Sequence, residues 1–151
     1  MVKISKEETL RVVAAMWRWL EKHPTKGKWQ WPGWKQFNGE AYPPYCACGL
    51  YVDYRHKKNE DGADCIPHCP MLPFWEKYKS DEEEFEDGPC TILTSPFTTW
   101  RSVKKAGKRK LTVYYAGLIK RGAEKLLREH LNGTNGVRKN SRRKKKLSSG
   151  R

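Results

Sequence analysis

The sequence lacks long apolar runs, and none of its stretches approaches the roughly 20 consecutive apolar residues that cross a bilayer. Hydrophobic residues make up only 37% of its 151 residues. The first residues also lack the apolar segment of a secretory signal peptide. These absences predict a soluble cytoplasmic protein with no membrane partner.

Recognised catalytic motifs are missing as well. The chain has no H-E-x-x-H motif, no zinc-deaminase motif and no phosphate-binding G-x-x-x-x-G-K loop. His56 is a loose candidate for a His-Asn-His nuclease, but it lies in a polar run, and an isolated loop histidine is usually solvated. We therefore expect no enzyme activity and no small-molecule substrate.

Acidic residues are scarce in the last third of the chain. Residues 101–151 contain 18 Lys and Arg but only 2 Asp and Glu, whereas residues 1–100 contain 13 and 15. The net charge of +14 therefore comes entirely from the last third. Such a block attracts a polyanion, which in a cell is most commonly RNA or DNA, although basic tails are often only solubilising.

Helical periodicity predicts two helices near the capping signals. Ser5 and Glu8 form a capping-box pattern ahead of apolar residues at helical spacing, which predicts a helix over residues 6–22. The Ser-Pro pair at residues 95–96 predicts a second helix that runs to Lys105 and breaks at the following Ala-Gly pair.

A third helix is predicted over residues 108–131, apolar inward and basic outward, with bulky apolar residues as its buried stripe. It is expected to end near Gly133, where glycine can adopt the left-handed cap conformation. Residues 133–151 have no apolar periodicity, so we expect a disordered basic tail behind one domain of residues 1–132. The candidate nucleic-acid-binding residues on this helix and tail are Lys108, Arg109, Lys110, Lys120, Arg121, Lys125, Arg128, Arg138, Lys139, Arg142, Arg143, Lys144, Lys145 and Lys146.

Five cysteines lie between residues 46 and 90. Thiols stay reduced in the cytosol, and an odd, clustered set is more typical of metal ligands than of disulfides. Two close pairs separated by a loop suit the tetrahedral coordination of zinc. We predict a structural Zn2+ held by ligands drawn from Cys46, Cys48, Cys65, Cys69 and Cys90.

Three ligand sets are open. The first uses the four early cysteines, the second replaces Cys46 or Cys48 by Cys90, and the third includes His68. Five buried, reduced thiols without metal are the alternative. Four thiolates would saturate the ion and leave no position for a catalytic water, which also argues against an enzyme.

The middle of the chain is predicted to be irregular, with short strands. Residues 49–54 are rich in β-forming side chains. The tryptophans at 29, 31 and 34 lie among Gly, Pro and polar residues without a regular period. Their rings can stack nucleobases, although packing as a substitute core is more typical of tryptophan. Together these features predict a small zinc-stabilised α+β domain.

The order of these motifs resembles a family. Trp-Pro-Gly-Trp at 31–34, Cys-Pro-Met-Leu at 69–72, and Cys90 ahead of Ser-Pro-Phe at 95–97 resemble small cysteine-rich, zinc-knuckle-like proteins encoded by tailed bacteriophages. The resemblance covers about residues 8–130. It implies a phage-encoded accessory protein with a cysteine-bound metal, working in the bacterial host cytosol.

Two functions follow from these surfaces. The first is nucleic-acid binding, of RNA or DNA, largely without sequence specificity, through the basic helix and tail. The second is a protein effector that binds a host or defence-system complex, with the aromatic residues of 29–45 as anchors and the basic helix against an acidic or RNA-containing partner.

Overall fold

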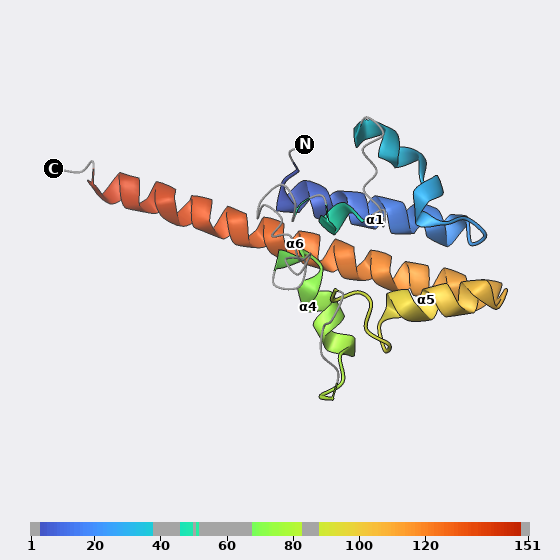
Figure 1. Ribbon diagram of the computed structural model, residues 1–151. Coiled ribbons are helices and arrows are strands. Elements are labelled where there is room, and N and C mark those ends of the chain that lie inside the picture. Colours follow the sequence, from blue (N-terminus) through green and yellow to red (C-terminus); the bar gives the residue numbers. More distant parts are fainter. Residues whose placement is uncertain (1–3, 38–45, 50, 52–67, 83–87, 149–151) are drawn as a thin grey trace, which may run out of the picture.

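The computed structural model describes residues 4–37, 46–49, 51, 68–82 and 88–148, with side chains described up to Thr134 in the last range (Figure 1). Its named elements are all helical. They are α1 (Lys6–Lys22), the 3-10 helices η1 (Lys28–Gln30) and η2 (Pro32–Phe37), α4 (Leu72–Trp75), the 3-10 helix η3 (Glu76–Tyr78), α5 (Pro96–Lys105) and α6 (Arg109–Ser148).

The predicted α+β class is wrong, because the described residues are mostly helical and contain no strand. The strand candidate at 49–54 lies mostly outside the described residues, while residues 47–49 and Tyr51 are helical. A strand needs a neighbour to pair its backbone groups, and no described segment offers one. One isolated run of β-forming residues was therefore too little evidence for a sheet.

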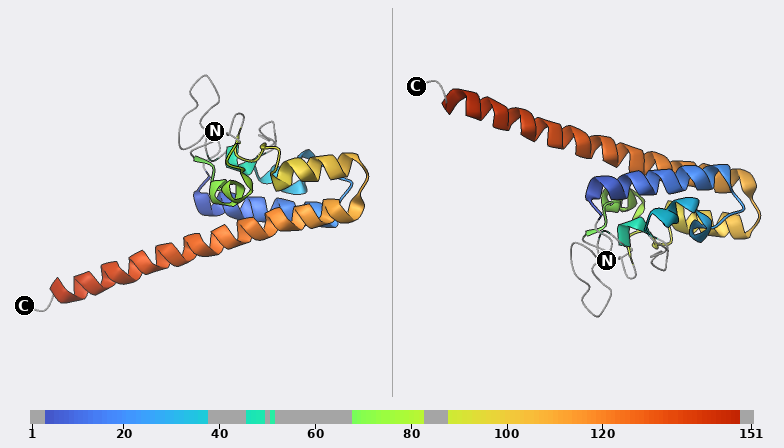
Figure 2. Two further views of the ribbon diagram at one scale, coloured as in Figure 1. Left: turned by 90° about the horizontal axis from the view of Figure 1, so that it is seen from below. Right: turned by 90° about the horizontal axis from the view of Figure 1, so that it is seen from above.

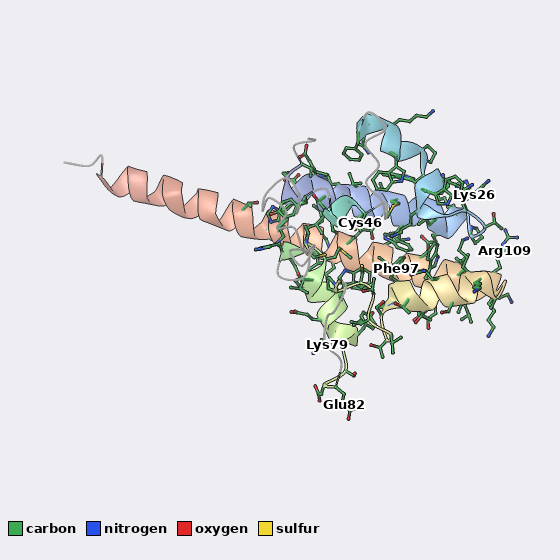
Figure 3. The ribbon with its side chains drawn as sticks, in the orientation of Figure 1. Lys26, Cys46, Lys79, Glu82, Phe97 and Arg109 are labelled. Atoms are coloured by element: carbon green, nitrogen blue, oxygen red, sulfur yellow. The ribbon has the colours of Figure 1, made fainter. Side chains whose placement is uncertain are left out.

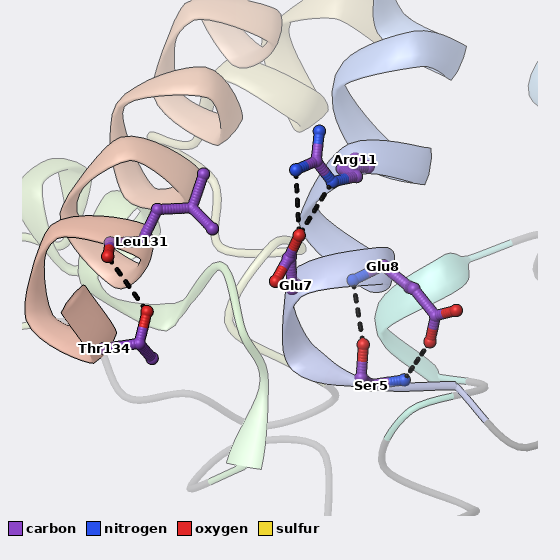
Figure 4. A network of polar contacts seen from close by, with 6 residues as sticks. All are labelled: Ser5, Glu7, Glu8, Arg11, Leu131 and Thr134. Atoms are coloured by element: carbon purple, nitrogen blue, oxygen red, sulfur yellow. Dashed lines mark hydrogen bonds and ion pairs between the residues drawn. The ribbon is translucent and has the colours of Figure 1, made fainter. Parts of the chain in front are cut away.

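α1 begins as its capping pattern predicted (Figure 4). The Glu8 amide donates to Ser5 Oγ at 3.1 Å, and the Ser5 amide donates to Glu8 Oε2 at 2.8 Å. These bonds satisfy backbone donors that a helix start otherwise leaves unpaired. The predicted range of residues 6–22 is confirmed.

α5 and α6 form an antiparallel hairpin. Ser95 Oγ accepts from the Thr98 amide at 3.1 Å and caps α5, which spans the predicted residues. Gly107 has φ of 70°, a left-handed conformation that suits glycine and lets the chain reverse. α6 then runs back beside α5 and antiparallel to α1 (Figures 1 and 2).

The core lies where α1, α5 and α6 meet. Leu10 and Leu20 of α1 are fully buried, as are Ala116, Ile119 and Ala123 of α6. The buried line of α6 thus includes two alanines, and these small side chains let the helices approach closely. Prediction had placed bulky residues on this line, but Leu111 is 43% exposed.

The helix end predicted near Gly133 is wrong, because α6 continues to Ser148. Gly133 is not among the glycines with positive φ, so it forms no left-handed cap. Thr134 Oγ1 donates to the Leu131 carbonyl at 2.9 Å, a bond within the continuing helix (Figure 4). The segment predicted to be disordered is helical up to Ser148, since Lys and Arg are good helix formers and cations suit the negative end of the helix dipole.

We call residues 132–148 the arm. α6 has 40 residues, which corresponds to about 60 Å at about 1.5 Å per residue. Beyond the start of α1, the arm projects away from the other described elements (Figure 2). Residues 132–134 are exposed, consistent with the absence of a packing partner in the described part of the chain.

Candidate nucleic-acid interface and cysteine cluster

The predicted basic residues of α6 fall into three groups. Lys108, Arg109 and Lys110 are exposed at the turn that precedes α6 and at its start. The middle group differs, because Lys120 is half-buried and its Nζ lies 2.6 Å from Glu21 Oε2. Lys120, a predicted phosphate contact, is therefore already engaged in an ion pair within the folded body.

Further along α6, Arg121, Lys125 and Arg128 are exposed. Lys125 Nζ lies 3.9 Å from Glu129 Oε1, a loose contact between two exposed side chains that leaves the lysine accessible. The third group lies on the helical backbone of the arm, beyond the residues whose side chains are described: Arg138, Lys139, Arg142, Arg143, Lys144, Lys145 and Lys146.

The prediction missed basic residues that the fold brings to the start of α6. Arg101, Lys104 and Lys105 of α5 lie close in sequence to the first group, and all of residues 101–110 contain no acid. Figure 3 shows Lys26 and Arg109 at the same end of the molecule. The run of cations was visible in the sequence, but its meeting with the segment after α1 required the fold.

Two of these cations share one aromatic ring. Lys28 Nζ lies 4.2 Å from the centre of the Phe97 ring, and Arg101 Cζ lies 5.8 Å from it. Cations are attracted to the negative face of an aromatic ring. The contact joins η1 to the first half of α5 and places Lys28 near Arg101.

The tryptophans of the predicted aromatic surface divide into core and surface residues. Trp31 and Trp34 are 8% and 5% exposed, and Trp34 Nε1 donates to the Lys28 carbonyl at 2.7 Å. Packing as core is therefore the confirmed interpretation for these two rings. Trp29 is 62% exposed and is the exception. Residues 38–45 of the proposed protein-binding surface lie outside the described residues.

Cys46, Cys48, Cys69 and Cys90 lie near one another in the described part of the chain. The Cys48 side chain is hydrogen-bonded to those of Cys46 and Cys69, and Cys90 lies near enough to be influenced by charge on Cys46 and Cys69. Ser95 Oγ donates to the Cys90 carbonyl at 2.6 Å, which ties this cysteine to the start of α5. All four thiols are free of disulfides.

The four thiols differ in acidity. The hydrogen bond from Cys48 lowers the pKa of Cys46 to about 6, and the nearby charge of Lys28 acts in the same direction. The pKa of Cys48 is raised well above its usual value because its proton is held in hydrogen bonds with Cys46 and Cys69. Burial raises the pKa of Cys90 to about 12. Cys46 is thus the thiol most ready to ionise in this group.

The predicted zinc-stabilised domain is not what the described residues show. Within the described ranges no group of three or more His, Cys, Asp or Glu side chains is arranged to hold a metal ion. The elements are instead held by the apolar core of α1, α5 and α6. Cys65 and His56 lie outside the described residues, and half-buried His68 is described at the edge of that gap. Zinc binding by a set that includes Cys65 stays a prediction.

No helix in the described part of the chain is long and apolar enough to cross a membrane. The chain matches no family model, no curated protein and no solved structure.

Proposed function

We propose that this chain is a phage-type accessory protein that contacts nucleic acid, largely without sequence specificity, through the basic C-terminal part of α6. The observation that carries the proposal is the arm, a continuous helix that leaves the folded body. Seven Lys and Arg lie between residues 138 and 146, and no acid follows Glu129.

Repulsion between the positive charges of the arm destabilises its helix. Arg138 and Arg142 are four residues apart, as are Lys139 and Arg143, and like charges at this spacing destabilise a helix by about 0.2–0.5 kcal/mol per pair. Most helices gain their stability by packing an apolar face, whereas the backbone of the arm projects away from the other described elements. A polyanion would relieve the repulsion and supply the missing partner.

The dimensions of the arm favour duplex DNA. An α-helix with its side chains is about 10–12 Å across, and the major groove of B-form DNA is about 12 Å wide. The major groove of duplex RNA is too narrow for such an element. Lysine and arginine contacts to phosphate position a protein on DNA without reading its sequence, which supports non-specific binding.

The setting follows from the resemblance stated above. A small protein that resembles tailed-phage accessory proteins is expected to act in the bacterial host cytosol, where phage and host DNA are its available partners. Among the described aromatics of residues 29–45, only Trp29 is exposed, so the alternative role as a protein effector has few described anchors.

The experiment compares duplex DNA binding by the full chain and by an arm-neutral variant, in which the seven Lys and Arg of residues 138–146 are changed to Gln. Glutamine keeps a helix propensity close to that of lysine and arginine. A charge-retaining variant, with Arg138, Arg142 and Arg143 changed to Lys, is the matched control. We expect the arm-neutral variant to lose most of its duplex affinity and the control to keep it. Equal affinity of all three proteins would contradict the proposal. A chain that binds no DNA but retains a host protein from a nuclease-treated lysate would favour the effector role.

A further inference from the structure

A second basic surface lies at the opposite end of α6 from the arm. Six cations fall within ten residues of the α5–α6 turn: Arg101, Lys104, Lys105, Lys108, Arg109 and Lys110. We call these residues the basic turn. Except for half-buried Lys104, their side chains are exposed.

The basic turn concentrates charge of one sign. Some exposed cations elsewhere on the body are paired, as Arg18 is with Glu124 at 2.7 Å and Arg11 with Glu7 at 2.8 Å. Among the residues that the structure describes, no cation of the basic turn has an ion-pair partner. Six like charges this close in the chain repel one another, which disfavours the compact state.

The position of these cations at the N-terminal end of α6 is also unfavourable. α6 has no acidic residue in its first turn, and instead begins with Arg109 and Lys110. The N-terminal end of a helix carries partial positive charge, so acids stabilise it and cations destabilise it. The chain therefore places cations where folding alone would favour carboxylates, as expected of a surface that meets an anionic ligand.

An exposed tryptophan adjoins in sequence a lysine that contacts the same ring as Arg101. Trp29 follows Lys28, and Lys28 shares the Phe97 ring with Arg101 of the basic turn. The Trp29 ring lies against Gly27, where a Cβ would be 2.8 Å from Nε1. The ring is thus held over the backbone while most of its surface remains open to solvent.

We propose that Trp29 and the basic turn form a second nucleic-acid site, which takes a single strand. Its phosphates would lie on the basic turn and one unpaired base would stack on Trp29. Basic surfaces that follow the backbone, joined to an aromatic ring that accepts any base, are the usual means of binding single strands without sequence preference. The inference rests on the proposed function in that its ligand is nucleic acid, but it uses residues other than the arm.

The experiment uses the full-length arm-neutral variant, so that the arm contributes no charge. A short oligothymidylate is titrated while tryptophan fluorescence and affinity are recorded. We expect binding that quenches fluorescence, because Trp29 is the exposed member of the seven tryptophans. Trp29→Ala should abolish the quenching and weaken affinity by about tenfold or more.

Two matched variants separate the charge from the ring. Changing Lys105 and Lys108 to Gln should reduce the slope of log affinity against log salt by about 1.4, or about 0.7 for each lost contact to a single strand. Changing the exposed Lys6 and Lys77, which lie outside the basic turn, to Gln should leave the slope of log affinity against log salt unchanged.

A third variant tests the position of the ring. Gly27→Ala keeps the charge and the tryptophan but inserts a methyl group where the ring lies, so it should weaken oligothymidylate binding without loss of fold. A circular dichroism spectrum checks the fold.

The outcomes distinguish this inference from the proposed function. Loss of oligothymidylate binding in the arm-neutral variant, when the unchanged protein binds it, would overturn the second site and leave the arm as the binding surface. Equal binding by Trp29→Ala would also overturn it. Oligothymidylate binding that survives in the arm-neutral variant, with no duplex binding by the unchanged protein, would support the second site and contradict the role of the arm.

Discussion

The ring of Phe74 lies against Gly122, so closely that a Cβ at this glycine would be 2.3 Å from Cδ2 of the ring. Phe74 is only 5% exposed, and the contact joins α4 to the middle of α6. Glycine is unfavourable inside a helix, and here its lack of a side chain is what lets the ring approach.

Gly122→Ala should therefore destabilise the protein, by about 1–2 kcal/mol in the free energy of unfolding, because overpacking outweighs the better helix propensity of alanine. Gly133→Ala is the matched control, since nothing lies within 4 Å of its hypothetical Cβ. It should leave the folded body intact and raise helicity. Urea denaturation measures the first effect and circular dichroism the second. A Gly133→Ala variant with unchanged helicity would argue against a helix that continues past this residue.

The ion pair between Glu21 and Lys120 should stabilise the packing of α1 on α6. Their side chains are 26% and 19% exposed and their charged atoms 2.6 Å apart, so a double-mutant cycle with Gln at both positions should show a coupling of about 1 kcal/mol. The exposed pair Lys125 and Glu129, at 3.9 Å, should show almost none. Equal coupling in the two cycles would contradict this difference.

Substitutions at two cations of α6 should separate effects on stability from effects on DNA binding. Lys120→Gln should lower stability but leave DNA affinity nearly unchanged, because its charge already has a partner. Arg128→Gln, at an exposed position of the same helix, should leave stability unchanged and reduce the salt slope of DNA binding by about 0.9. The opposite pattern would show that Lys120 contacts phosphate.

Cys46 should control how stability depends on pH. Its pKa falls from an ordinary value of 9.0 to about 6 in the folded protein. An acid with a lowered pKa binds protons more weakly when folded, so its contribution is fully present above pH 9 and is lost as pH falls through 6. The unfolding free energy of reduced, metal-free protein should rise with pH across this window, and Cys46→Ser should flatten the rise. An unchanged pH profile in the variant would contradict the assignment.

The reactivity of Cys46 also tests the zinc prediction. In reduced, metal-free protein, iodoacetamide at neutral pH should modify Cys46 ahead of Cys48 and Cys90, whose pKa values are raised. Zinc bound by a cysteine set that includes Cys65 should protect Cys46, and a chelator should restore its reactivity. Reactivity unaffected by zinc would overturn the prediction of cysteine ligands.

The sequence predicted those elements whose ends carry local signals. Ser5 and Ser95 cap helices at the expected residues, because a cap is a contact within one turn. The end of α6 was missed because a glycine marks a helix end only when it adopts positive φ, as Gly107 does and Gly133 does not.

Features that depend on tertiary contact were harder to predict. Four of the cysteines lie near one another, but the described residues contain no group of three or more metal-ligating side chains. The cysteine spacing did not show that the described core would be apolar and helical rather than a sheet around an ion. The cluster of positive charge in the basic turn could be predicted from the sequence. The meeting of Arg101 with Lys28, the sequence neighbour of Trp29, at Phe97 could not be predicted, because these residues are far apart in the chain.

The central claim is that the arm of α6 binds duplex DNA through its phosphates, and the salt dependence of the dissociation constant tests it most directly. If all seven cations of residues 138–146 contact phosphates, they contribute about −6 to the slope of log affinity against log salt. The account predicts that the arm-neutral variant loses most of that slope, while the Arg-to-Lys control keeps it. A slope that is the same with and without the charges of the arm would contradict the account.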